Sequence, residues 1–221
     1  IKILLCLLLF ICGSIMIHAQ NERSIYNDRY DDSDMNFHNN ISIGITPSAI
    51  MNRWIGYQGK LSYFYKKIEF VANAGYLSGS DQWDPYTGYR LRPTIKHHFA
   101  KTDAGSFYWG FGYLWRQLNV QTSGSFFVPN GSGSVQRNFE VGERMRGLLA
   151  MFGVLVPFRN ERFRFDGGMG FGNAGIRTAH INAPDNESYI PTDNIFSTDY
   201  KTPGNRNYMI FFVHLSLHVR I

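Results

Sequence analysis

Cysteine is nearly absent from this chain. Cys6 and Cys12 are the only two, and both lie within the first 19 of the 221 residues. A chain without cysteine beyond that segment has no disulfide framework, so packing and hydrogen bonds must hold its fold. A large excess of one charge is also missing. Without residues 1–19 the formal net charge is 21 minus 17, or +4, which is too small to indicate a nucleic-acid partner.

Residues 1–19 have the layout of a secretory signal peptide. A basic residue, Lys2, precedes an apolar run from Ile3 to Cys12, and the small Ala19 ends the segment. Cleavage is therefore expected after Ala19. The alternative is a retained membrane anchor, for which the segment is near the lower limit of length.

Helical periodicity is missing from the rest of the chain. Residues 20–39 are polar, acidic and aperiodic, which predicts a loosely held N-terminal arm. From Asn40 onward apolar residues recur at every second position, which indicates β-strands. Eight segments are predicted as strands: about 40–47, 54–64, 67–77, 88–99, 106–118, 143–156, 162–178 and 207–221. Both faces of the sixth segment are apolar, so its phase stays open.

Short and long connections alternate between these segments. The short ones are "YKK", "AKTDAGS" and "PFRNE", whereas residues 78–87, 119–142 and 179–206 form long ones. Alternation of this kind places all long loops at one end, as in outer-membrane barrels with short periplasmic turns and long extracellular loops. The predicted fold is an all-β, eight-stranded antiparallel up-and-down transmembrane β-barrel over residues 40–221.

The stretch "FYWGFGYLW", Phe107 to Trp115, shows how the two faces differ. Every odd position is aromatic, and Gly110 and Gly112 lie between them. The other strands likewise contrast a crowded apolar face with one rich in Gly, Ser, Thr and charge. Side chains fill the narrow interior of an eight-stranded barrel, so the rings are expected to face lipid. A soluble barrel with its apolar face inward is the alternative.

Charges of both signs lie on the predicted inward faces. Glu69 and Asp166 are expected to pair with cations of neighbouring strands, because an unpaired buried charge is expensive. The candidate cations are Arg90, Arg92, Lys96, Arg116 and Arg164.

Aromatic residues near the strand ends predict girdles at two lipid–water boundaries. They are Tyr57, Tyr63, Tyr76, Tyr89, Phe99, Phe107, Tyr113 and Trp115. Ordinary β-propensity is the other explanation for rings at these positions.

Two segments resemble a family of small outer-membrane β-barrel proteins of Bacteroidetes, a domain of unknown function. Residues 88–120 contain "GYRLRP", a short turn and an aromatic strand ending at Arg116 and Gln117, and residues 163–177 form a glycine-rich strand ending in Gly-Ile-Arg. The resemblance implies the bacterial outer membrane as location. It also implies the barrel fold, and for such a barrel we expect outer-membrane lipid, lipopolysaccharide and the β-barrel assembly machinery as partners, and a monomer. It implies no biochemical activity.

His214 and Ser216 in "HLS" have the spacing of a base–nucleophile pair on one strand face. They resemble the His-x-Ser of outer-membrane lipid A deacylases, which need the pair at the lipid-facing surface. Here the alternation turns both inward. His97 and His98 point to opposite faces and cannot chelate one metal together.

We therefore assign no catalytic, cofactor-binding or metal-ligating residue from the sequence. The predicted function is that of a non-enzymatic outer-membrane barrel, structural or surface-binding, that acts through its long loops; its interior is too narrow for a general porin channel. The alternatives are a lipid-modifying hydrolase that uses His214 and Ser216, and a soluble secreted barrel that binds an apolar ligand.

Overall fold

The computed structural model describes residues 37–46, 54–81, 84–102, 105–128, 133–158, 162–183, 188–190 and 201–221. Its strands are β1 (Phe37–Ile45), β2 (Gly56–Lys66), β3 (Ile68–Asp81), β4 (Asp84–Thr102), β5 (Gly105–Phe127), β6 (Ser134–Pro157), β7 (Phe163–His180), β8 (Ser188–Tyr189) and β9 (Gly204–Arg220). Within these ranges no helix is long and apolar enough to cross a membrane. The predicted signal peptide and all but the last three residues of the predicted arm lie outside them.

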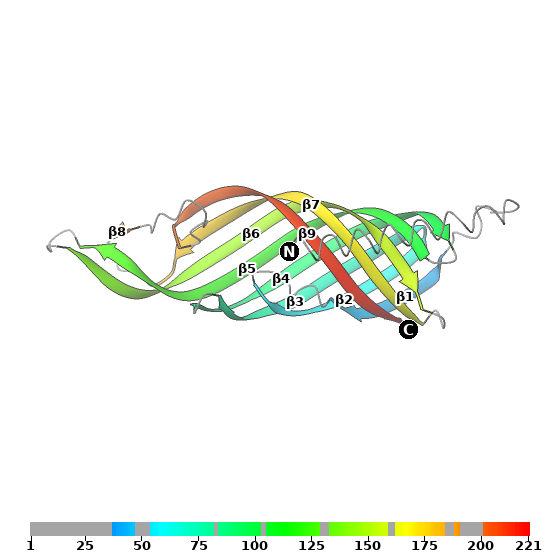
Figure 1. The fold of residues 1–221 in the computed structure, drawn as a ribbon, viewed down its shortest axis with the longest axis horizontal. Coiled ribbons are helices and arrows are strands. Elements are labelled where there is room, and N and C mark those ends of the chain that lie inside the picture. The colour runs from blue at the N-terminus through cyan, green and yellow to red at the C-terminus, as the bar shows by residue number, and fades with distance from the viewer. Residues whose placement is uncertain are drawn as a thin grey trace, which may run out of the picture.

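The strands form one antiparallel sheet that closes into a ring (Figure 1). Each strand from β1 to β6 pairs with the next, and β9 pairs with both β7 and β1. β8 pairs only with the far end of β5. The all-β prediction is confirmed. The count of eight strands is wrong, because the sheet has nine: the two-residue β8 lies inside the predicted loop 179–206 and is too short for a periodic pattern.

Two of the three predicted long loops are largely strand. β5 and β6 stay paired from Asn119↔Gly142 to Phe127↔Ser134, and β3 and β4 stay paired as far as Asp81↔Asp84. The predicted strands end where their outward faces become polar. Their inward faces continue the period, with Val120, Phe126, Phe139 and Val141 all buried. Loop boundaries read from the outward polarity alone were therefore wrong.

We call residues 119–127 and 134–142 the outer hairpin. It extends beyond the other strands at the left of Figure 1. The end of the ring from which it projects is called the hairpin end. The opposite end, where Lys66 and Lys67 join β2 to β3, is called the turn end.

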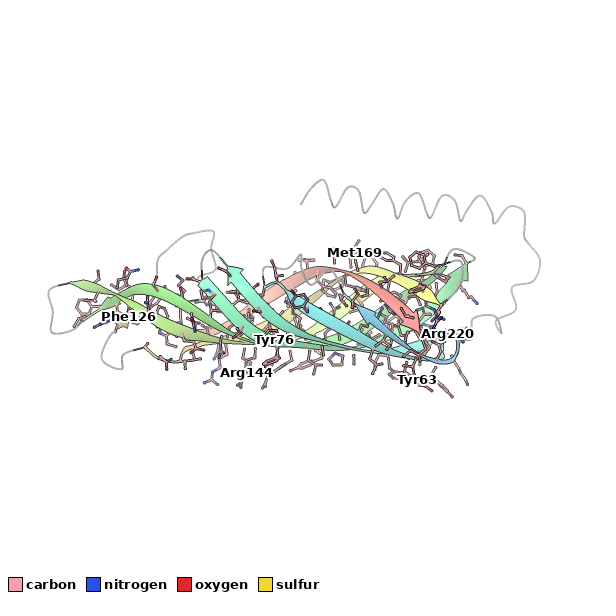
Figure 2. All side chains as sticks on the ribbon, turned by 90° about the horizontal axis from the view of Figure 1, so that it is seen from below. Tyr63, Tyr76, Phe126, Arg144, Met169 and Arg220 are labelled. Atoms are coloured by element: carbon pink, nitrogen blue, oxygen red, sulfur yellow. The ribbon has the colours of Figure 1, made fainter. Side chains whose placement is uncertain are left out.

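The two faces of the ring have the polarity that the sequence predicts. Large apolar side chains face outward, such as Tyr57 at 83% exposure and Phe211 at 76%. Glu69 and Asp166 face inward with 0% exposure. In Figure 2 the side chains project from both faces of the sheet. The structure also decides the phase of β6, in which Met145 points inward and Leu148 outward.

The stretch Phe107–Trp115 follows the same division. Trp109, Phe111 and Tyr113 are exposed, and Phe107 and Trp115 are half-buried. Tyr108, which lies between them on the opposite face, is fully buried inside the ring.

An apolar cluster fills the hairpin end. Its buried members are Trp54, Leu77, Tyr86, Leu118, Val120, Phe126, Phe139 and Val141, and Ala183 and Tyr189 pack against them. The ring of Phe126 lies 5.1 Å from that of Phe139 and 5.6 Å from that of Tyr189. His180 contacts Phe139 at 4.7 Å. Through these rings β8 holds the inward side of the outer hairpin.

We predict that Phe126→Ala frees the outer hairpin. Phe126 has 0% exposure, and removal of a buried Phe side chain costs about 3–5 kcal/mol. Amide hydrogen exchange across residues 119–142 should rise, while exchange in β2 and β3 stays unchanged. The matched control is Phe127→Ala, because Phe127 is 50% exposed and its exchange should match the parent's. Equal exchange in the two variants would contradict this account of the hairpin.

Candidate functional site

Two buried carboxylates, Asp166 of β7 and Glu69 of β3, lie inside the ring, near the turn end of their strands. The Asp166 Oδ2 atom accepts hydrogen bonds from the Nζ atoms of Lys60 and Lys96, each at 2.5 Å. Glu69 lies 3.4 Å from Lys60 and 3.5 Å from Lys96. Lys60 belongs to β2, which β1 and β9 separate from β7, so the pair spans the interior. Two ammonium groups thus face two carboxylates, and their formal charges cancel.

Side chains of β5 and β9 supply further hydrogen bonds to Asp166. The Tyr108 hydroxyl donates to Oδ1 at 2.6 Å, and His214 Nε2 lies 3.0 Å from the same oxygen. His218 Nε2 is 2.8 Å from Lys60 Nζ. We call these residues, with Glu69, Lys96, His98 and Ser106, the interior network; His98 lies 2.6 Å from the Ser106 hydroxyl and 3.4 Å from Glu69.

Glycines make room for this network. A Cβ atom on Gly168 would lie 2.8 Å from the Tyr108 hydroxyl, the His214 ring and the backbone oxygen of Phe152. One on Gly153 would lie 2.7 Å from Cζ of Tyr108. Both distances are too short for carbon, so a side chain at either position would displace Tyr108. The glycine-rich segment "GGMGFG" therefore leaves space for a tyrosine of β5.

The structure places the predicted cations in different surroundings. Lys96 pairs with both carboxylates, as predicted. Arg116 instead donates to Glu143 at 2.5 Å. The guanidinium groups of Arg92 and Arg164 lie over the rings of Phe212 and Phe64, 5.2 and 5.1 Å from their centroids. Arg90 donates to the backbone oxygen of Trp54 at 3.4 Å.

Sequence reasoning missed Lys60, Tyr108 and the histidines as partners. Lys60, His98, His214 and His218 occupied predicted inward faces, so their side of the sheet was known. Tyr108 is a ring in an aromatic run, and only its even position indicated that it points inward. Which strands meet across the interior was not available from alternation.

His214 and Ser216 are both buried inside the ring, with 3% and 1% exposure. His214 is bonded to Asp166 and lies 3.1 Å from the Tyr108 hydroxyl. The Ser216 hydroxyl lies 3.3 Å from that of Thr46 on β1. His214 and Ser216 therefore bond to different partners. Neither side chain reaches the outward surface, on which a lipid substrate would lie.

The interior network links six strands of the ring through their side chains. It joins side chains of β2, β3, β4, β5, β7 and β9, so all of these strands converge on one charge-balanced group. Breaking a buried pair by removing one partner is strongly destabilising, because the remaining charge is uncompensated. Among the described residues, no group of three or more His, Cys, Asp or Glu side chains has the arrangement to hold a metal ion.

The outward surface carries an open groove of about 510 Å³ toward the hairpin end. Four of the eight predicted girdle residues, Tyr57, Tyr76, Tyr89 and Trp115, line it together with Ala74 and Leu91. Tyr57, Tyr76 and Tyr89 are direct cross-strand neighbours, and the rings of the last two lie 5.5 Å apart. The exposed Tyr63 and Phe99 lie closer to the turn end.

Comparison of the chain with protein-family models, with curated proteins and with solved structures found no match.

We predict that Asp166→Asn destabilises the whole ring. It removes the negative charge that Lys60 and Lys96 share, which costs about 3–5 kcal/mol for a buried pair. The unfolding midpoint in denaturant, followed by tryptophan fluorescence, should fall. Glu140→Gln is the control: this half-buried carboxylate of the outer hairpin is far from the network, and the change should stay within about 0.5 kcal/mol. Adding Lys60→Met to Asp166→Asn should recover part of the loss; a double variant less stable than the single one would contradict charge balance as the cause.

We also predict that Gly168→Ala is poorly tolerated, whereas Gly59→Ala is tolerated. A Cβ on Gly168 meets backbone and Tyr108 at 2.8 Å, but one on Gly59 has its nearest neighbour at 3.9 Å. The two variants make the same chemical change in strands of one ring. The yield of folded protein and the denaturation midpoint should fall only for Gly168→Ala. Equal midpoints would show that Tyr108 does not need this space.

Proposed function

We propose that the protein is an up-and-down transmembrane β-barrel of the bacterial outer membrane, closed by eight of its nine strands. The observation that carries the proposal is the polarity of the ring. Charged side chains are buried inside, and rings such as Phe111 and Phe211, 61% and 76% exposed, cover the outside. A soluble barrel that binds an apolar ligand needs the opposite arrangement. Lipid is the solvent in which this outward face is stable.

The height of the outward apolar band supports the same proposal. Tyr89 and Phe99 lie ten positions apart on β4 and are both exposed. Ten residues span about 33 Å along a strand, or about 25 Å along the axis of a barrel whose strands tilt by about 40°. That is the height of the apolar band of outer-membrane barrels. On the neighbouring strands the outward face becomes polar at Gln117, Arg146, Asn173 and Asn207.

The filled interior argues against transport through the ring. The interior network and the apolar cluster at the hairpin end leave side chains packed along the axis. The outer hairpin is then the element presented to the exterior. Its nine residues of β5 continue beyond the band for about 30 Å, measured along the strand. We propose that the protein has a structural or surface-binding role exerted through this hairpin.

The resemblance to small outer-membrane barrels of Bacteroidetes extends the proposal to family and location. On this proposal, residues 1–19 direct export, and the β-barrel assembly machinery inserts residues 40–221 into the outer membrane as a monomer. Lipopolysaccharide and phospholipid then surround the apolar band.

Fractionation of the native host tests the proposal. The protein should sediment with outer membranes, stay there in high salt and be released only by detergent. On gels, unboiled protein should migrate differently from boiled protein, because a closed ring resists denaturation by detergent without heat. Recovery from the soluble periplasm without detergent would refute the membrane location.

A further inference from the structure

Three arginines lie together on the outward face, directly above the apolar band. Arg144 and Arg146 are two positions apart on β6, and Arg177 of β7 is the cross-strand partner of Arg144. All three are exposed. The Cβ atoms of directly opposed residues lie about 4.5–5.5 Å apart, and like charges at that spacing repel each other.

No acidic residue opposes these arginines in the sheet. Arg146 lies between Trp115 and Gly175, and Arg144 between Gln117 and Arg177. The other neighbour of Arg177 is Asn205. None of the three forms an ion pair within the described part of the chain. Among the described residues nothing compensates this positive charge, and an external anion would relieve the repulsion.

The apolar groove adjoins the same arginines. Trp115, which lines the groove, is the direct cross-strand neighbour of Arg146. Tyr89, another lining residue, pairs with Gln117, which in turn pairs with Arg144. Figure 2 shows Tyr76 and Arg144 at a similar level along the long axis. The aromatic lining of the groove thus continues into a cationic surface.

We propose that this surface is a binding site for a phosphorylated, acylated lipid of the outer leaflet. Arg144, Arg146 and Arg177 hold the phosphate, and one acyl chain lies in the groove beside Trp115. Guanidinium groups bind phosphate through paired hydrogen bonds, which explains three arginines rather than scattered lysines. The inference rests on the proposed membrane location, because only there does a lipid reach this face. The groove distinguishes such a ligand from free phosphate, which has no apolar part.

Binding of purified lipid A to the full chain in detergent micelles tests the site. Lipid A carries phosphates and several acyl chains, and its dephosphorylated form serves as the matched probe. The variant R144Q/R146Q should weaken the binding of lipid A at least tenfold. The wild type should bind the dephosphorylated form as weakly as the variant binds lipid A. R144K/R146K, which keeps the charge but loses the paired hydrogen bonds, should bind lipid A with an affinity between those of the wild type and R144Q/R146Q.

The matched control is R162Q/K101Q, which removes the same charge at the turn end, where both side chains are exposed. Its affinity should change less than twofold. A loss equal to that of R144Q/R146Q would overturn the site in favour of general charge attraction. Inorganic phosphate that displaces lipid A at comparable concentration would overturn the lipid as ligand.

A groove variant, Ala74→Phe, separates the two halves of the site. It places a ring at an exposed lining position of the groove and should weaken lipid A binding without changing the arginines. Unchanged binding would refute the place of the acyl chain. The gel mobility of unboiled protein reports folding of every variant. Lipid binding that fails in folded, membrane-inserted protein refutes this inference alone, whereas loss of membrane location refutes the proposed function.

Discussion

The carboxylate of Asp166 lies between the ammonium groups of Lys60 and Lys96, and much of the interior is arranged around it. A buried carboxylate requires nearby cations and hydrogen-bond donors, because burial without them is very unfavourable. Tyr108 and His214 supply the remaining bonds. Their rings in turn require Gly153 and Gly168 to lack side chains. One ion-paired group thus accounts for a glycine of β6 and a glycine of β7.

A charged interior also constrains the exterior. Each strand has two faces, and when the inward one carries polar side chains, the apolar residues that the chain needs must face outward. In water, an outward face with Tyr57, Phe111 and Phe211 exposed would drive association. In lipid it is the stable arrangement, and this is the physical basis of the proposed membrane location. The polar interior and the apolar exterior therefore result from the same constraint on the strands.

The polarity of the inward face and that of the outward face change at different levels along the axis. The outward face becomes polar near Gln117 and Arg146, whereas the inward face stays apolar through Phe126 and Phe139. This offset allows β5 and β6 to continue as the outer hairpin, because an apolar cluster under its inward side holds it. It also places exposed arginines beside an aromatic groove at the level of the change. The hairpin and the proposed lipid site both lie where the outward face has become polar and the inward face is still apolar.

Much of this could be predicted from the sequence, because successive strand side chains point to opposite faces. Alternation alone assigned Glu69, Lys96, Asp166, His214 and Ser216 to the inside and the rings of residues 107–115 chiefly to the outside. It did not reveal the phase of β6, whose faces are both apolar, or the extension of β5 and β6 past their polar outward residues. Only the closed tertiary structure decided that Lys60 and Tyr108 meet Asp166. The period of a strand specifies the face of each side chain, but the stagger of the closed ring determines which side chains meet across it.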